Sequence, residues 1–286
     1  MQMPKICSVP VFRADKNNVN PSTGEYVDPL MKMPLRGAAF SNEVGEGLRP
    51  LIGEYATLSW IPALLYIGAD IYDKYKNNQT EYSPSSRRGF QQAVFQGMAS
   101  IALPLVAVKA GQNLFSMIGL ASKDKITINM QEKISELAQR YVTNGKMHKY
   151  RNKQDECIKD FVDTVLNNTD SQLKKTFEFN KKADVKKYAE NTIKNLISMY
   201  KSFMMPTEKF KETNWYKNFK QAIQNGQTDN VAAKTILAKY QDSKTIKGRV
   251  IRTLGGFVAL SIAINPIDKF VEDVLIEKLM NHKKDA

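Results

Sequence analysis

Apolar and charged positions divide this chain into three apolar stretches and one long amphipathic region. The longest stretch, residues 89–108, carries no charge over 20 positions, about the length that a helix needs to cross a bilayer core. The stretches 55–69 and 253–267 each hold only 15 uncharged residues. Segments of that length occur both as membrane spans and as buried helices of soluble domains, so length alone favours neither.

The ends and the composition of these stretches favour a membrane. A further uncharged run at 110–122 follows Lys109 and predicts either an extension of the longest stretch or a short additional helix. Small residues, among them Gly97, Gly255 and Gly256, would let helices approach closely where lipid supplies no hydrophobic drive. We therefore expect an all-α fold with three or four hydrophobic transmembrane helices and an inserted amphipathic helical bundle.

The region between Lys123 and Lys247 has a different pattern. Its apolar residues recur every three or four positions, the spacing of one face of an α-helix, and alternating strand patterns are absent. Thr207 is placed to cap the start of a helix and Gly226 to end it. The predicted helices are 130–142, 152–166, 183–204, the helix from Thr207 to Gly226, and 229–240.

Charge is concentrated in the same region. The chain has a net charge of +13, and residues 123–247 hold 25 Lys and Arg against 15 Asp and Glu, a net of +10. A basic domain can meet nucleic acid, an anionic lipid surface or an acidic protein, or it can be a solvated lysine-rich surface. Only Arg140 and Arg151 are arginines among the basic residues here, which argues against nucleic-acid binding because arginine is the preferred reader of bases.

Catalytic chemistry has few candidates in this sequence. Cys7 and Cys157 form neither a disulfide framework nor a zinc pattern, and His148 and His282 stand alone. No glycine-rich nucleotide-binding signature occurs. We therefore expect a non-enzymatic protein with no catalytic residue, no cofactor and no metal.

Ionised residues stand at the margins of the apolar stretches. Glu43, Glu46 and Arg49 are spaced three apart, so Glu46 and Arg49 can pair on one helix face. Asp70 and Lys74 can pair at the end of the first stretch, and Asp268 closes the last one. One interpretation makes these residues solvated helix ends. The other predicts that Glu46, Arg49, Asp70 and Asp268 pair between helices near the membrane boundary, because unpaired charge at membrane depth is costly.

Four motifs, in order, resemble those of the mitochondrial fission process protein family. Ser41-Asn42-Glu43-Val44-Gly45-Glu46, followed by Leu48-Arg49-Pro50, resembles its opening motif. Residues 69–74 are similar to the motif at the end of its first membrane helix, 95–104 to its second span and 265–271 to its C-terminal motif. The motif residues are Asn42, Glu43, Gly45, Glu46, Arg49, Pro50, Asp70, Asp73, Lys74, Pro104, Pro266 and Asp268.

This resemblance implies a multi-pass protein of the mitochondrial inner membrane that promotes organelle division without catalytic chemistry of its own. In a bacterium the same fold would lie in the cytoplasmic membrane. The expected domains are a disordered lead-in (1–36), a family-like hydrophobic part (37–122 and 248–280), a basic insert (123–247) and a tail (281–286).

The expected partners are the lipid bilayer and another membrane or division protein bound by the basic insert. The alternative that the residues leave open is a soluble all-α binding protein. Its basic bundle would engage an acidic partner or nucleic acid.

Overall fold

The computed structural model describes residues 30, 35–76, 84–144, 153–167 and 179–278. These residues are helical with connecting turns, and they contain no strand, as the sequence predicts. The predicted lead-in and tail lie outside the described residues, apart from Leu30 and the first helical residues from Leu35.

The chain forms two compact units, unit 1 (residues 1–112 and 253–286) and unit 2 (residues 113–252). Two helices, α5 (Leu103–Ser116) and α13 (Asp229–Phe270), contribute to both units. The units divide at 112/113 and 252/253, whereas the sequence placed the limits of the basic insert at 122/123 and 247/248.

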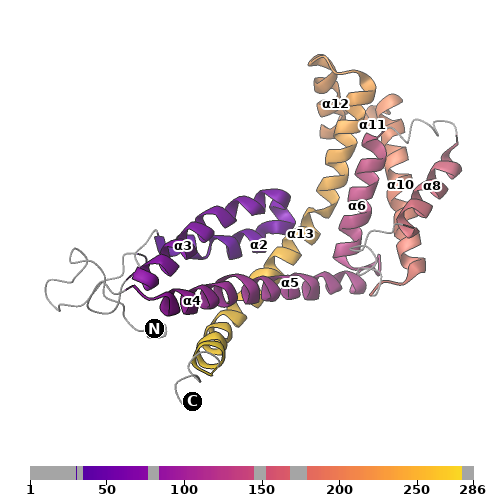
Figure 1. Cartoon of the computed structure of the whole chain (residues 1–286). Coiled ribbons are helices and arrows are strands. Elements are labelled where there is room, and N and C mark those ends of the chain that lie inside the picture. Colours follow the sequence, from indigo (N-terminus) through magenta and orange to yellow (C-terminus); the bar gives the residue numbers. More distant parts are fainter. Residues whose placement is uncertain (1–29, 31–34, 77–83, 145–152, 168–178, 279–286) are drawn as a thin grey trace, which may run out of the picture. The chain divides into compact units, whose positions relative to one another are not determined.

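Unit 1 is built from the N-terminal helices and the C-terminal part of α13 (Figure 1). Its first elements are α1 (Leu35–Ala39), α2 (Ser41–Ile52), the 3-10 helix η3 (Gly53–Ser59) and α3 (Trp60–Lys76). They are followed by α4 (Ser86–Phe95), the π-helix η4 (Gln96–Ala102) and α5, and the described chain ends in the π-helix η6 (Val271–Lys278). α3 packs against both α2 and α4.

Two helices in the described residues are long and apolar enough to cross a membrane, Ser86–Ala121 and Asp229–Leu275. The prediction of three or four is therefore wrong. The stretch 55–69 falls partly in η3, and α3 is only 17 residues long and ends in charged residues. The run 110–122 is no separate helix, because α4, η4, α5 and η5 (Met117–Ala121) form one continuous helical segment. Lys109 does not interrupt it, since lysine is a good helix former.

Unit 2 is a helical bundle of α6 (Ile128–Thr143), α8 (Gln154–Leu166), α10 (Lys182–Met204), α11 (Glu208–Lys211), α12 (Asn214–Gln224) and the first part of α13. Its hydrophobic core contains Ile134, Phe161, Ile193, Leu196 and Leu237, each fully buried. α10 packs against α6 and α8 (Figure 1). The helices predicted at 130–142, 152–166 and 183–204 agree with α6, α8 and α10 to within about two residues at each end.

Two predictions in this region need correction. Thr207 does cap a helix, accepting a hydrogen bond from the Phe210 amide at 3.3 Å, but that helix is short. A second cap, Thr213, starts α12 by accepting from the Tyr216 amide at 3.3 Å. The last helix does not end at Tyr240 but continues to Phe270, because no proline or capping sequence interrupts it before the apolar stretch.

Candidate functional site

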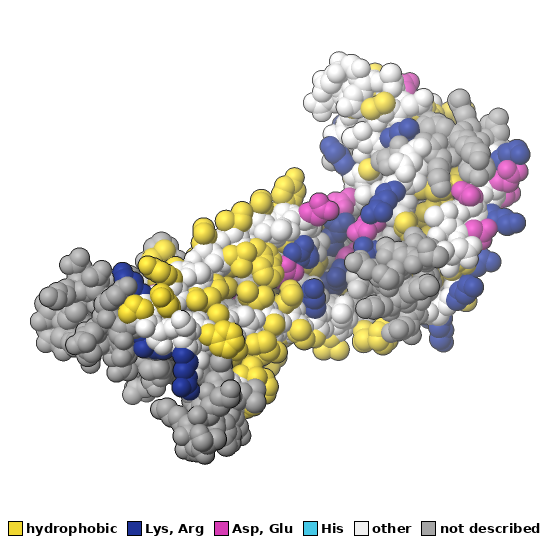
Figure 2. Space-filling model, in the orientation of Figure 1, with side chains coloured by type: hydrophobic (Ala, Val, Ile, Leu, Met, Phe, Trp, Pro, Cys, Tyr) yellow, Lys and Arg dark blue, Asp and Glu magenta, His cyan; other side chains and the backbone are white. Residues whose placement is uncertain are grey.

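Unit 1 exposes large apolar side chains and buries several charged and amide side chains. Large apolar side chains are exposed along its helices, including Tyr55 (76%), Leu65 (70%) and Ile262 (71%). Figure 2 shows many hydrophobic side chains on the visible face of unit 1. Eight polar side chains of this unit are also buried, and they form the candidate site: Asn42, Glu43, Glu46, Asp70, Lys74, Gln96, Gln112 and Thr253.

One part of the site surrounds the Asp70 carboxylate on α3. Both Gln92 of α4 and Gln96 of η4 donate their side-chain amides to Asp70 Oδ2, the latter at 2.6 Å. Lys74 Nζ lies 3.9 Å from Asp70 Oδ1 and 3.5 Å from Asp73 Oδ2. Because Asp70 and Lys74 expose only 8% and 7% of their side chains, this ion pair is largely removed from solvent, and its hydrogen bonds join α3 to the next helix.

The polar chain continues from Asp70 towards α2. Gln96 Oε1 accepts a hydrogen bond from Ser100 Oγ at 2.6 Å, and the Ser100 carbonyl accepts one from Asn42 Nδ2 at 2.8 Å. Gln96 and Ser100 both belong to the π-helix η4, a rare conformation that occurs often at functional sites. Three helical segments, α3, η4 and α2, are thereby linked through one line of hydrogen bonds.

A second part of the site surrounds the Glu46 carboxylate on α2. Arg49 donates to both carboxylate oxygens, with its Nε 2.7 Å from Oε2. Trp60, the first residue of α3, donates its indole N–H to Oε1 at 2.9 Å. Gln112 of α5 donates to the backbone carbonyl of Glu46 at 2.8 Å. Glu46 and its backbone thus receive donors from two other helices.

Glycines allow the helices of unit 1 to come this close. A Cβ on Gly45 would lie 1.7 Å from Ser59 Oγ, and one on Gly111 would lie 2.2 Å from the Gly255 carbonyl oxygen. Gly111 would also meet Ala259 Cβ at 2.5 Å. The close approach expected from Gly255 therefore occurs, at the contact of α5 and α13, whereas a Cβ on Gly97 would meet nothing within 4 Å.

The predicted site residues lie in α2, α3, α5 and α13. Glu46 pairs with Arg49 within α2, and Asp70 pairs with Lys74 within α3, both as the spacing predicts. Arg49 and Asp268, both described, form no ion pair with each other, so the predicted pairing of all four charges between helices is not observed. Asn42, Glu43 and Gly45 are buried in α2, Arg49 and Pro50 are half-buried there, Pro104 lies in the first turn of α5, and Pro266 and Asp268 lie in α13.

Sequence reasoning missed the partners that join these charges to other helices: Trp60, Gln92, Gln96, Ser100 and Gln112. One signal was available, since Gln92 and Gln96 are one helical turn apart within an otherwise apolar segment. A second signal is Pro104, which has no backbone N–H and therefore leaves the carbonyl of Ser100, four residues earlier, without its α-helical donor.

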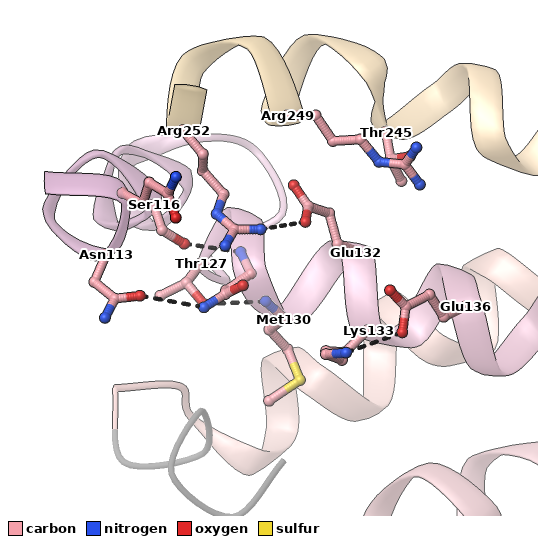
Figure 3. Close-up of polar contacts among 12 residues, drawn as sticks. Asn113, Ser116, Thr127, Met130, Glu132, Lys133, Glu136, Thr245, Arg249 and Arg252 are labelled. Atoms are coloured by element: carbon pink, nitrogen blue, oxygen red, sulfur yellow. Dashed lines mark hydrogen bonds and ion pairs between the residues drawn. The ribbon is translucent and has the colours of Figure 1, made fainter. Parts of the chain in front are cut away.

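Unit 2 has a buried ion pair of its own, between Glu132 of α6 and Arg252 of α13 (Figure 3). Arg249 lies nearby and pairs with Asp242 at 2.7 Å. Burial raises the pKa of Glu132 above its ordinary value, and the neighbouring Arg252 and Arg249 guanidinium groups lower the pKa by a smaller amount. One Glu132 carboxylate oxygen, Oε1, is buried without a hydrogen-bond partner.

This raised pKa predicts how the stability of unit 2 depends on pH. The native state binds the Glu132 proton more tightly than the unfolded chain does, so the stability gained from protonation is lost as pH rises through the raised pKa. The free energy of unfolding of the wild type, compared with that of Glu132→Gln, should therefore be larger near pH 4.5 than at pH 7.5. Urea unfolding followed by circular dichroism measures both proteins at each pH. A pH-independent difference between them would contradict the assignment.

Searches against protein-family models, curated proteins and solved structures find no match to this chain. Among residues 35–76, 84–144, 153–167 and 179–278, no group of three or more His, Cys, Asp or Glu residues could hold a metal ion. The polar site in unit 1 joins helices through carboxylates that accept from amide, indole, ammonium and guanidinium groups.

Proposed function

We propose that this chain is a non-enzymatic integral membrane protein that takes part in the division or organisation of its membrane. The observation that carries the membrane assignment is the exposure of its two apolar helices. Only 22% of the residues in the apolar window of each helix are buried within the chain. A core helix of a water-soluble protein would be mostly buried, because covering a Leu or Ile side chain contributes about 1.5–3 kcal/mol.

The polar interior of unit 1 supports the same assignment. In lipid, charged and amide groups are costly unless they are paired, and they face the interior of a helical bundle. The Asp70 and Glu46 clusters have this arrangement, with donors from neighbouring helices and apolar side chains outside. If the protein were soluble, another molecule would have to cover the exposed apolar side chains of unit 1. A soluble binding protein would account for the net charge of the insert but not for these exposed side chains.

The role in membrane division comes from the resemblance to the mitochondrial fission process protein family. All four motifs of that resemblance lie in α2, α3, the Ser86–Ala121 helix and α13, the elements that carry the apolar surface and the polar site. We place the protein in the mitochondrial inner membrane if the source is a eukaryote and in the cytoplasmic membrane if it is a bacterium. Its chain leaves the membrane at the end of the Ser86–Ala121 helix and re-enters it in α13.

Extraction of membranes from expressing cells with alkaline carbonate tests the insertion. We expect the full chain to remain in the membrane pellet, and release into the supernatant would refute integral insertion. Depletion of the protein in its source cells tests the role in division. We expect longer mitochondria in a eukaryote, or longer cells in a bacterium. Unchanged lengths, with the protein still found in the pellet, would refute the division role alone.

A further inference from the structure

The part of unit 2 that contains η5, the start of α6 and Gly248 has a defined local structure. A Cβ on Gly119 of η5 would lie 2.4 Å from the Ile126 carbonyl oxygen, and one on Gly248 of α13 would lie 2.5 Å from Ile128 Cγ2. The Ser116 hydroxyl of α5 accepts a hydrogen bond from the Asn129 amide at 2.8 Å (Figure 3). The end of η5, the first turn of α6 and the Gly248 region of α13 are therefore packed together.

Four exposed lysines lie on the segments that form this packed region, Lys123 and Lys125 in the loop after η5 and Lys244 and Lys247 on α13. We call them the lysine collar. No ion pair of these four lysines is found among the described residues, whereas both nearby arginines, Arg249 and Arg252, are paired with carboxylates. Lys244 Nζ lies 4.4 Å from the centre of the Tyr240 ring.

Exposed apolar side chains lie close to the collar in the sequence and on the same elements. Ile118 (52%) and Leu120 (37%) are on η5, and Ile246 (45%) and Val250 (41%) are on α13. Ile246 and Val250 are one helical turn apart, with Lys247 between them. Lysines next to exposed apolar residues, at the ends of membrane helices, match a bilayer interface, where headgroups carry charge and the adjacent layer is apolar.

We propose that the lysine collar binds the anionic headgroups of the membrane in which the apolar helices lie. This inference rests on the proposed membrane insertion. The partner of the basic unit is then an anionic lipid bound at four lysines. It is not a nucleic acid bound over the whole surface of the unit. Asp124, between Lys123 and Lys125 in the chain, is the one acidic residue from 122 to 126, so the collar keeps a positive charge.

The test measures lipid binding by the full chain, purified in neutral detergent and freed of lipid. Native mass spectrometry gives the affinity for phosphatidylglycerol and for phosphatidylcholine. We expect a preference for phosphatidylglycerol that is roughly 1,000-fold weaker when all four collar lysines are changed to Gln, because each Lys near an anionic surface contributes about 1 kcal/mol. Circular dichroism establishes that the variant keeps its helix content.

A matched control changes four exposed lysines elsewhere in unit 2 by the same charge: Lys201→Gln, Lys209→Gln, Lys217→Gln and Lys220→Gln. The control should keep the preference. Equal binding of the two lipids by the wild type, or equal losses in the two variants, would overturn the proposal. Displacement of phosphatidylglycerol by an equal concentration of inorganic phosphate would assign the site to a free anion and also overturn it. Release of the wild type by alkaline carbonate would instead refute insertion itself.

Discussion

Gly111→Ala should destabilise the protein by about 2 kcal/mol or more, although alanine is the better helix former. The new methyl group would lie 2.2 Å from the Gly255 carbonyl oxygen and 2.5 Å from Ala259 Cβ. Because the nearest obstacle is backbone, the clash is relieved only by separating α5 from α13. Thermal unfolding of the purified chain in detergent micelles measures the loss.

Gly68→Ala is the matched control for this prediction. Gly68 lies within α3, and a Cβ there would meet nothing within 4 Å. The same substitution should stabilise the protein by about 0.5–1 kcal/mol, the helix-propensity difference between the two residues. Equal effects at Gly68 and Gly111 would show that helix propensity, rather than the contact of α5 with α13, decides both results.

Asp70→Ala should cost about 3 kcal/mol or more, the loss expected when one member of a buried pair is removed. The change removes the acceptor of the Gln92 and Gln96 amides and one carboxylate beside the buried Lys74. Asp70→Asn keeps an oxygen that can accept from a glutamine, so it should cost less. Thermal unfolding in detergent micelles compares both variants with the wild type.

A double-mutant cycle separates the ion pair from the amide contacts. Asp70→Ala combined with Lys74→Met should cost less than the sum of the two single changes, by about 0.5–3 kcal/mol, since the second change removes a charge that the first leaves buried. Additive costs would mean that Asp70 and Lys74 do not stabilise each other, and that Asp70 acts through the two glutamines.

The sequence predicts the all-α class and the amphipathic helices of unit 2 well, because their cores follow the helical repeat. It predicts the ion pairs Glu46–Arg49 and Asp70–Lys74, since these depend only on spacing within one helix. It fails where the outcome depends on helix continuity or on contacts between helices. Apolar length alone did not reveal that residues 55–69 are shared between η3 and α3, nor that Trp60 would donate to Glu46.

The π-helix η4 sets the rotational register of the helix that contains it. In a regular α-helix, Gln96 and Gln112 would point about 160° apart, at 100° per residue over the intervening turns. Both side chains are nevertheless buried, Gln96 donating to Asp70 and Gln112 to the Glu46 carbonyl. A π-helix turns less per residue, and so it reduces this difference. Deleting a single residue from η4, such as Met98, would leave the two glutamines 15 positions apart, which is about 60° in a regular α-helix. The segment could then return to α-helical geometry with both glutamines still directed towards their partners.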